Sequence, residues 1–143
     1  MSTVTVRVPA KVNLQLAVGG PRPDGFHELA TVYQALSLYD DVTAIVGDEL
    51  TISVEGEGAD LVPMDETNLA WRAACELAEQ AGLEPRAHLH IRKGIPVASG
   101  LAGGSADAAG ALLALDLLWD THLDRDELTV IAGRLGSDVP FAL

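Results

Sequence analysis

The order of the expected elements predicts an α+β fold, in which helices cover one face of a mostly antiparallel sheet. Segments rich in β-branched residues fill the first 54 residues, and segments with helical spacing fill most of the rest, with one strand between them. The chain has 143 residues, of which 48% are hydrophobic and 21% charged, which is enough for one domain with a sizeable core.

Runs of β-branched and apolar residues, broken by turn-forming residues, predict the strands. Pro9 ends the first strand, and glycine- and proline-rich or acidic segments at 19–25, 39–41 and 56–63 predict turns and loops. The expected strands cover residues 3–8, 12–18, 29–38, 42–46, 50–54 and 87–93.

Helical spacing predicts a first helix over residues 68–81, where apolar side chains recur at intervals of three and four. Thr67 or Asn68 can cap its start, and Gly82 can end it. A second helix, over 106–119, is apolar nearly all round, so we expect it to be buried on several sides.

A third helix is expected to begin after Asp124 and to run through Arg134, with Glu127 placed to complete a capping box. Residues 136–141 predict a turn into another helix or strand. Cys75 stands alone in a helical pattern, and we expect it to be a small core residue.

The formal net charge of −12 opposes non-specific nucleic-acid binding, which requires a basic face, but it does not oppose nucleotide binding by a few local donors. No apolar stretch reaches the roughly 20 residues that span a bilayer, and the N-terminus does not have a signal-peptide pattern, so we expect a cytoplasmic protein. Most acidic residues are expected in solvated turns and helix starts, among them Asp40, Asp41, Asp48, Glu49, Glu55, Glu57, Asp65, Glu66, Asp124, Asp126 and Glu127.

The most informative motif is the glycine-rich run over residues 96–107, between an expected strand and an expected helix. Gly100, Gly103 and Gly104 have no Cβ, so a phosphate can lie against their backbone, and a helix N-terminus attracts negative charge. The run matches neither the Walker A order nor a clean Gly-x-Gly-x-x-Gly signature. It predicts a phosphate-binding loop for a nucleotide; the alternative is a tight strand-to-helix turn without a ligand.

Two further segments carry candidate catalytic groups. Asp138, followed by Pro140, is either a helix cap or a carboxylate that accepts a proton from a substrate hydroxyl. Lys11 and Asn13 point to the same side of an expected strand, where they could orient a phosphate or an alcohol, although a lysine on a polar strand face is commonplace.

Aromatic and imidazole side chains provide weaker signals. Phe26 and His27 could stack on a base and hydrogen-bond it, or Phe26 could be core and His27 could satisfy a loop carbonyl. His88 and His90 alternate on one strand face without further histidine or cysteine nearby, so we expect structural or solvent-facing roles for both.

Three of these segments, at residues 9–14, 96–109 and 135–140, resemble the GHMP kinase superfamily in kind and order, and the resemblance runs along the whole chain. The Asp-Gly-Phe-His segment at 24–27 narrows it to members whose substrate is a cytidyl diphosphate of methylerythritol. The resemblance implies a fold like that of ribosomal protein S5 domain 2. It also implies that residues 1–143 form the N-terminal, ATP-binding domain, and that the C-terminal domain that closes the cleft is absent from this chain. We therefore expect weak or absent turnover from residues 1–143 alone.

The implied activity is the ATP-dependent phosphorylation of the substrate's 2-hydroxyl, in the non-mevalonate route to isoprenoid precursors. The resemblance implies Asp138 as the base and Lys11 as its positioning and charge-stabilising partner. Asn13 would hold the substrate, Phe26 would stack on the cytosine and His27 would hydrogen-bond it. Phosphoryl transfer depends chiefly on positioning and charge stabilisation, which these residue types can supply.

The resemblance also implies a nucleotide site, with Asn68 and Lys93 near the adenosine and Mg²⁺ bridging the phosphates. Ser105 is the candidate metal ligand, and Ala102 departs from the family's frequent glycine. The alternatives are another small-molecule GHMP kinase, a truncated nucleotide-binding domain without turnover, or an RNA-binding module of similar fold, which the charge argues against. The residues implied to wrap the ATP phosphates are Pro96, Val97, Ala98, Ser99, Gly100, Leu101, Ala102, Gly103, Gly104 and Ser105.

Overall fold

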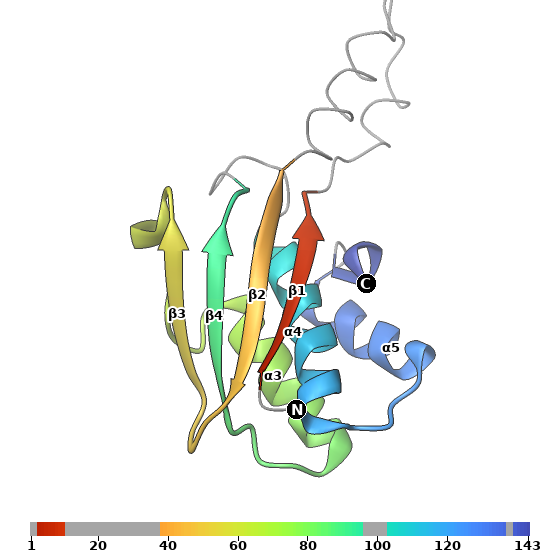
Figure 1. Ribbon diagram of the computed structural model, residues 1–143. Coiled ribbons are helices and arrows are strands. Elements are labelled where there is room, and N and C mark those ends of the chain that lie inside the picture. The colour runs from red at the N-terminus through yellow and green to blue at the C-terminus, as the bar shows by residue number, and fades with distance from the viewer. Residues whose placement is uncertain (1–2, 11–37, 96–102, 137–138) are drawn as a thin grey trace, which may run out of the picture.

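The computed structural model describes residues 3–10, 38–95, 103–136 and 139–143 (Figure 1). Within these ranges a sheet of four strands has the order β1-β2-β4-β3. The β1–β2 and β2–β4 pairs are antiparallel and the β3–β4 pair is parallel, so the predicted α+β class with a mostly antiparallel sheet is confirmed. The strands are β1 (Thr3–Pro9), β2 (Tyr39–Val46), β3 (Thr51–Gly56) and β4 (Ala87–Lys93).

The helices lie on one side of this sheet, as Figure 1 shows. Helix α4 packs directly on β1 and β2, α3 packs beside α4, and α5 packs on both helices. In the part of the chain that the structure describes, no helix is both long and apolar enough to cross a bilayer. The helices are α3 (Leu69–Ala81), α4 (Gly103–Trp119) and α5 (Arg125–Leu135), with 3₁₀ turns η1 (Ala59–Leu61) and η2 (Val139–Ala142).

The predicted caps determine where two of the helices begin and end. The Asn68 side chain accepts a hydrogen bond from the Ala70 amide, and Gly82 ends α3 in the left-handed conformation at φ 71°. The Asp124 side chain accepts a hydrogen bond from the Glu127 amide at 2.8 Å and so begins α5. The expected helix boundaries at these ends are therefore confirmed to within one residue.

Close packing of α4 on the sheet depends on its small residues. A Cβ added at Gly110 would lie 2.8 Å from Val42 Cγ2 and 3.2 Å from Val8 Cγ1, so a side chain at this position would push the helix away from β1 and β2. The other residues of α4 from Ala106 to Leu112 are buried as well, which confirms the expectation of a helix covered on several sides.

Several expectations were wrong in detail. Residues 39–41 are not a turn but the first residues of β2, and α4 begins at Gly103 rather than at Ala106. Cys75 is exposed rather than part of the core, because it lies on the side of α3 that faces solvent. The strands expected at 12–18 and 29–38 and the loop at 19–25 lie outside the described residues, except for Leu38.

Candidate functional site

The strand register brings two chain segments together at one end of the sheet. Pro9 pairs with Tyr39, and the Ala10 amide donates to the Leu38 carbonyl at 2.9 Å. On the other side of β2, a Cβ at Gly94 would lie 2.0 Å from the Tyr39 carbonyl oxygen, so this glycine backbone is pressed against β2. The chain therefore leaves β1 towards Lys11, and β4 towards the glycine-rich run, at the same end of the sheet.

Helix α4 begins close to this end and offers backbone amides to an anion. Gly103, Gly104 and Ser105 form its first turn, where N–H groups have no partner within the helix and the helix dipole is positive. Gly104 is exposed, and a Cβ there would lie 4.0 Å from Leu69 Cδ1, so the start of α3 adjoins the start of α4. The local geometry therefore suits a phosphate group.

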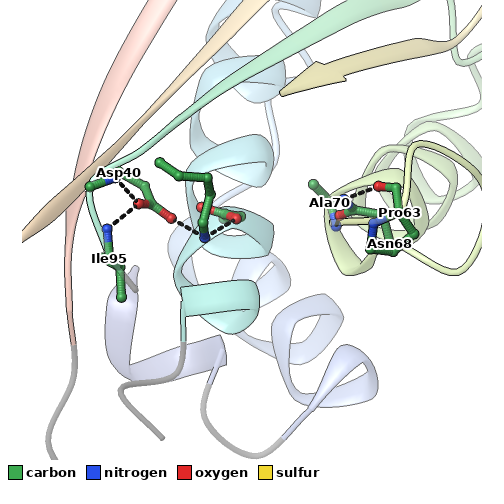
Figure 2. A network of polar contacts seen from close by, with 8 residues as sticks. Asp40, Pro63, Asn68, Ala70 and Ile95 are labelled. Carbon is green, nitrogen blue, oxygen red and sulfur yellow. Dashed lines mark hydrogen bonds and ion pairs between the residues drawn. The ribbon is translucent and has the colours of Figure 1, made fainter. Parts of the chain in front are cut away.

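Asn68, expected near the adenosine, has its side chain committed to the start of α3. Its Oδ1 accepts from the Ala70 amide at 2.8 Å and its Nδ2 donates to the Pro63 carbonyl at 2.8 Å (Figure 2). Asn68 is buried. Its place beside Leu69, at the adjoining helix starts, is near the candidate phosphate site, and its described hydrogen bonds hold the backbone there.

Lys93, also expected near the adenosine, belongs to a buried charged cluster, which we call the Asp40–Lys93–Asp107 cluster. Lys93 Nζ donates to Asp40 Oδ2 at 2.6 Å and to Asp107 Oδ2 at 3.0 Å. Asp40 Oδ1 accepts from the Gly94 and Ile95 amides, each at 2.8 Å, of which Figure 2 marks the contact with Ile95. The three side chains are between 0% and 3% exposed, so the cluster is closed to solvent.

The pKa values of the two carboxyl groups in the cluster are shifted in opposite directions. Burial alone would raise the pKa of Asp40, but hydrogen bonds from Asp107, Lys93 and the Ile95 amide hold it below its ordinary value. Burial, reinforced by the hydrogen bond with Asp40, raises the pKa of Asp107 to about 9 despite the attraction of Lys93. Burial opposes the charge on Lys93, yet its two carboxyl partners raise its pKa above the ordinary value. At neutral pH, Asp107 is therefore a neutral acid beside an ionised Asp40–Lys93 pair.

Among the described residues, Asp107 Oδ1 is the atom of this cluster that has no hydrogen-bond partner. It is buried. The oxygens of a carboxylate require more hydrogen-bond donors than those of a protonated carboxyl group. The unpartnered Oδ1 therefore agrees with a neutral Asp107.

The face of the sheet away from the helices carries a separate chain of hydrogen bonds between β3 and β4. His88 bonds to Thr51 Oγ1 through Nδ1 at 2.7 Å and to Ser53 Oγ through Nε2 at 2.8 Å. Ser53 Oγ also lies 2.6 Å from His90 Nδ1, and His90 Nε2 lies 3.1 Å from Glu55 Oε1. In the parts of the chain described here, no cluster of three or more metal-ligating side chains occurs. These hydrogen bonds between β3 and β4 give His88 and His90 a structural role, one of the two roles expected for them.

Several predicted site residues lie outside the described ranges, so their roles remain predictions. The chain on either side of Asp138 is described: Gly136 follows α5, and Val139 is buried, with Val139 Cγ2 3.7 Å from a Cβ added at Gly136. The element that contains Val139 packs on α4. The residues outside are Lys11, Asn13, Phe26, His27, Pro96, Val97, Ala98, Ser99, Gly100, Leu101, Ala102 and Asp138.

Sequence reasoning missed Asp40 and Asp107 as members of this cluster. Asp40 was expected in a solvated turn, but it shares the inward face of β2 with Val42 and Ala44, and this alternation was the available signal. Asp107 is a single charged residue in an otherwise apolar stretch of α4, which is a signal for a buried, paired group.

The chain belongs to the GHMP kinases, whose N-terminal domain model matches residues 68–143, more than half of its length. Among curated relatives, it is 66% identical over 141 residues to the 4-diphosphocytidyl-2-C-methyl-D-erythritol kinase of Streptomyces avermitilis, covering 99% of this chain and 48% of the relative. It is 56% identical over 141 residues to the kinase of the same name from Mycolicibacterium paratuberculosis, covering 99% of this chain and 45% of the relative. The chain thus spans about half the length of these relatives.

Solved structures confirm the expected fold. The homoserine kinase of Cytophaga hutchinsonii aligns with all of this chain and 43% of its own, with a TM-score of 0.73 at 18% identity, which supports the fold alone. A 4-(cytidine 5'-diphospho)-2C-methyl-D-erythritol kinase aligns with 98% of this chain and 46% of its own, with a TM-score of 0.51 at 26% identity.

Proposed function

We propose that this chain is the nucleotide-binding part of a kinase that transfers phosphate from ATP to the 2-hydroxyl of 4-diphosphocytidyl-2-C-methyl-D-erythritol. The observation that carries the proposal is the 66% identity over 99% of the chain to a relative of that name. The N-terminus of α4, which follows a strand and is accessible at Gly104, supplies the matching physical feature. We propose that the reaction takes place in the cytoplasm and serves isoprenoid precursor synthesis.

In this proposal Asp138 accepts the proton of the substrate hydroxyl, and Lys11 positions it and stabilises the developing charge. Asn13 holds the acceptor, while Phe26 stacks on the cytosine and His27 hydrogen-bonds its edge. The described structure supports this arrangement indirectly, since the chain leading to Lys11 leaves the sheet at the end where α4 begins.

The phosphates of ATP would lie against residues 96–105, with the first-turn amides of α4 as donors. Mg²⁺ prefers oxygen ligands and usually keeps several waters beside substrate phosphates. Ser105, a half-buried residue in the first turn of α4, fits one such position through its hydroxyl, and the ion would neutralise phosphate charge. Asn68 would support the nucleotide by holding the start of α3, beside Gly104.

A direct test measures ATP consumption by the full-length protein with the cytidyl substrate, mevalonate or homoserine as the acceptor. We expect turnover with the cytidyl substrate and loss of about three or more orders of magnitude in Asp138→Asn, with ATP affinity largely kept. Asp120→Asn is the matched control, because Asp120 is exposed and has a positive φ of 52°, which asparagine tolerates. Preference for another alcohol would overturn the substrate, and a retained rate in Asp138→Asn would remove Asp138 from the base role.

Residues 1–143 alone should bind ATP but turn it over weakly or not at all, because the relatives are about twice as long and the acceptor would have fewer contacts. Calorimetric titration with ATP and a product assay on the same preparation test this. Specific turnover comparable to that of the full-length protein would contradict the expectation that these residues bind ATP but do not suffice for turnover.

A further inference from the structure

We propose that the Asp40–Lys93–Asp107 cluster is a positioning device that holds the end of β4 and the start of α4 in one arrangement, and thereby sets the affinity of the adjoining site for ATP. This inference rests on the proposed nucleotide-binding function. It assigns Lys93 an indirect role in place of direct contact with the adenosine.

The cluster joins both borders of the glycine-rich run. On one border, Lys93 is the last residue of β4, and Asp40 Oδ1 accepts from the two amides that follow it, at 2.8 Å each. On the other border, Asp107 lies one turn into α4. Lys93 Nζ links the two borders through contacts of 2.6 Å and 3.0 Å. A single ammonium group therefore bridges the strand end and the helix start.

Burial excludes the simpler role for Lys93. Its side chain is 3% exposed, and its ammonium group already donates to two carboxyl groups. A ligand at the surface would have to break these contacts to reach it, leaving buried carboxyl groups without their donor, at high energetic cost. Lys93 is therefore placed to act through the backbone that it holds.

The strand end is also constrained from both neighbouring strands. A Cβ at Gly94 would lie 2.0 Å from the Tyr39 carbonyl oxygen of β2, and a Cβ at Gly56 would lie 2.5 Å from the Lys93 carbonyl oxygen. Both glycines permit backbone approaches that other residues do not. The end of β4 thus has little freedom to shift, and the cluster transmits its position to α4.

The charges of the cluster balance, so uncharged groups can replace the stability that the ion pair supplies. Asp40 and Lys93 form an ion pair and Asp107 is neutral at pH 7, so the cluster carries no net charge. Buried ion pairs are commonly no more stabilising than apolar groups of the same volume. Removing both charges together can therefore restore stability while the bridge between strand and helix stays broken.

The test compares Lys93→Met with the double variant Asp40→Asn/Lys93→Met in the full-length protein. Thermal unfolding, the ATP dissociation constant, KM for each substrate and kcat are measured. We expect Lys93→Met to lower the unfolding temperature and to weaken ATP binding by roughly tenfold or more, with KM for the alcohol changed less than about twofold. The double variant should recover most of the unfolding temperature and keep the weakened ATP binding. Arg134→Met, which removes an exposed contact with Glu76 between α5 and α3, is the matched control and should leave ATP binding unchanged.

ATP binding restored together with stability in the double variant would overturn the inference, because the cluster would then be structural only. An equal rise of both KM values would overturn it too, since a general loosening of the fold would explain the result. Direct ATP binding separates this inference from the proposed reaction. A protein that binds ATP through an intact cluster but does not phosphorylate the cytidyl substrate disproves the reaction and leaves the inference standing. A wild-type protein that does not bind ATP disproves both.

Discussion

Asp40 and Asp41 are identical side chains at adjacent positions of β2, and they lie in opposite environments. Asp40 points to the helix-covered face, is fully buried and pairs with Lys93. Asp41 points to the open face and pairs with Arg7 at 2.9 Å, with the Asp41 side chain 25% exposed and that of Arg7 66% exposed. Since successive strand residues alternate between faces, one step along the chain changes a solvated surface pair into a buried structural cluster.

The same contrast holds for the two faces of the sheet as a whole. The inner face excludes water, so polar groups there depend on protein partners, and among the described residues Asp40, Lys93 and Asp107 partner one another in one compact cluster, with Asp107 Oδ1 left without a partner. The open face carries a longer row of hydrogen bonds, from Thr51 through His88, Ser53 and His90 to Glu55, whose groups remain in reach of water. Water can replace lost partners on the open face but not on the inner one, so matched substitutions should have very different effects.

The largest expected difference is between Asp40→Ala and Asp41→Ala. Asp40→Ala removes the ionised partner of a buried lysine and the acceptor of two amides, so we expect a loss of about 3–5 kcal/mol in the free energy of unfolding. Asp41→Ala should lose far less, because solvent already screens its pair with Arg7. Urea denaturation of both variants measures the difference, and equal losses would refute the contrast between the faces.

A second difference concerns glycines in helices that do or do not touch the sheet. Gly110→Ala places a methyl group 2.8 Å from Val42 Cγ2, so we expect destabilisation by roughly 1–3 kcal/mol in spite of alanine's better helix propensity. Gly133→Ala, in α5, meets nothing within 4 Å and should stabilise the protein by about 0.5–1 kcal/mol. We expect Gly110→Ala to lower the unfolding temperature and Gly133→Ala to raise it. A higher unfolding temperature in both variants would show that α4 does not approach the sheet so closely.

The third prediction is the pH dependence of Asp107→Asn. The folded-state pKa of Asp107, about 9, lies above its unfolded value of 3.8, so the stability that this group supplies is present below pH 4 and is lost as pH rises towards 9. Asparagine mimics the neutral acid and does not ionise. The free energy of unfolding of the variant, measured relative to the wild type by chemical denaturation, should therefore rise by roughly 1–3 kcal/mol from pH 5 to pH 8.

Asp41→Asn is the control for Asp107→Asn, because the stability that Asp41 supplies should change with pH in the opposite direction. A hydrogen bond from Arg7 lowers the pKa of Asp41, so its contribution is present above the ordinary pKa of 3.8 and is lost as pH falls through the lowered value. The wild type should therefore have a higher free energy of unfolding than Asp41→Asn at neutral pH, and this difference should disappear only in acid. A difference between wild type and Asp107→Asn that does not change with pH would show that Asp107 is ionised in the folded protein.

The smallest expected effect is that of Ser53→Ala on the open face. The substitution removes the hydroxyl between His88 Nε2 and His90 Nδ1, which water can replace because both rings are partly exposed. We expect a loss below about 1 kcal/mol, measured by thermal unfolding. A loss as large as that of Asp40→Ala would make this row as important to folding as the buried cluster.

The sequence predicted the elements that depend on local chemistry. The helix caps at Asn68 and Asp124 and the glycine end of α3 follow from side chains within a few residues, and the structure confirms them. The glycine-rich start of α4 was also found, although its helix begins earlier than expected because the small residues Gly103 and Gly104 join its first turn. The roles of Lys11 and Asp138 stay predictions.

The parts that the sequence did not predict depend on contacts between distant residues. Asp40 lies 53 positions from Lys93, and Asp107 lies 14 positions beyond it, so no local window contains the cluster. Two adjacent acidic residues after a tyrosine are typical of a turn, and only the pairing of Tyr39 with Pro9 shows that they belong to a strand. Tertiary pairing overrode the local preference there.

Gly104 at the start of α4 adjoins Leu69 at the start of α3, so these two helices have their positive ends together. Both ends favour an anion beside them, whereas the net charge of −12 on these 143 residues repels an anion from a distance. Added salt screens the distant repulsion, which acts over about 10 Å at 0.1 M, more than the close attraction. ATP should therefore associate faster as ionic strength rises, the reverse of what a basic phosphate-binding surface would show.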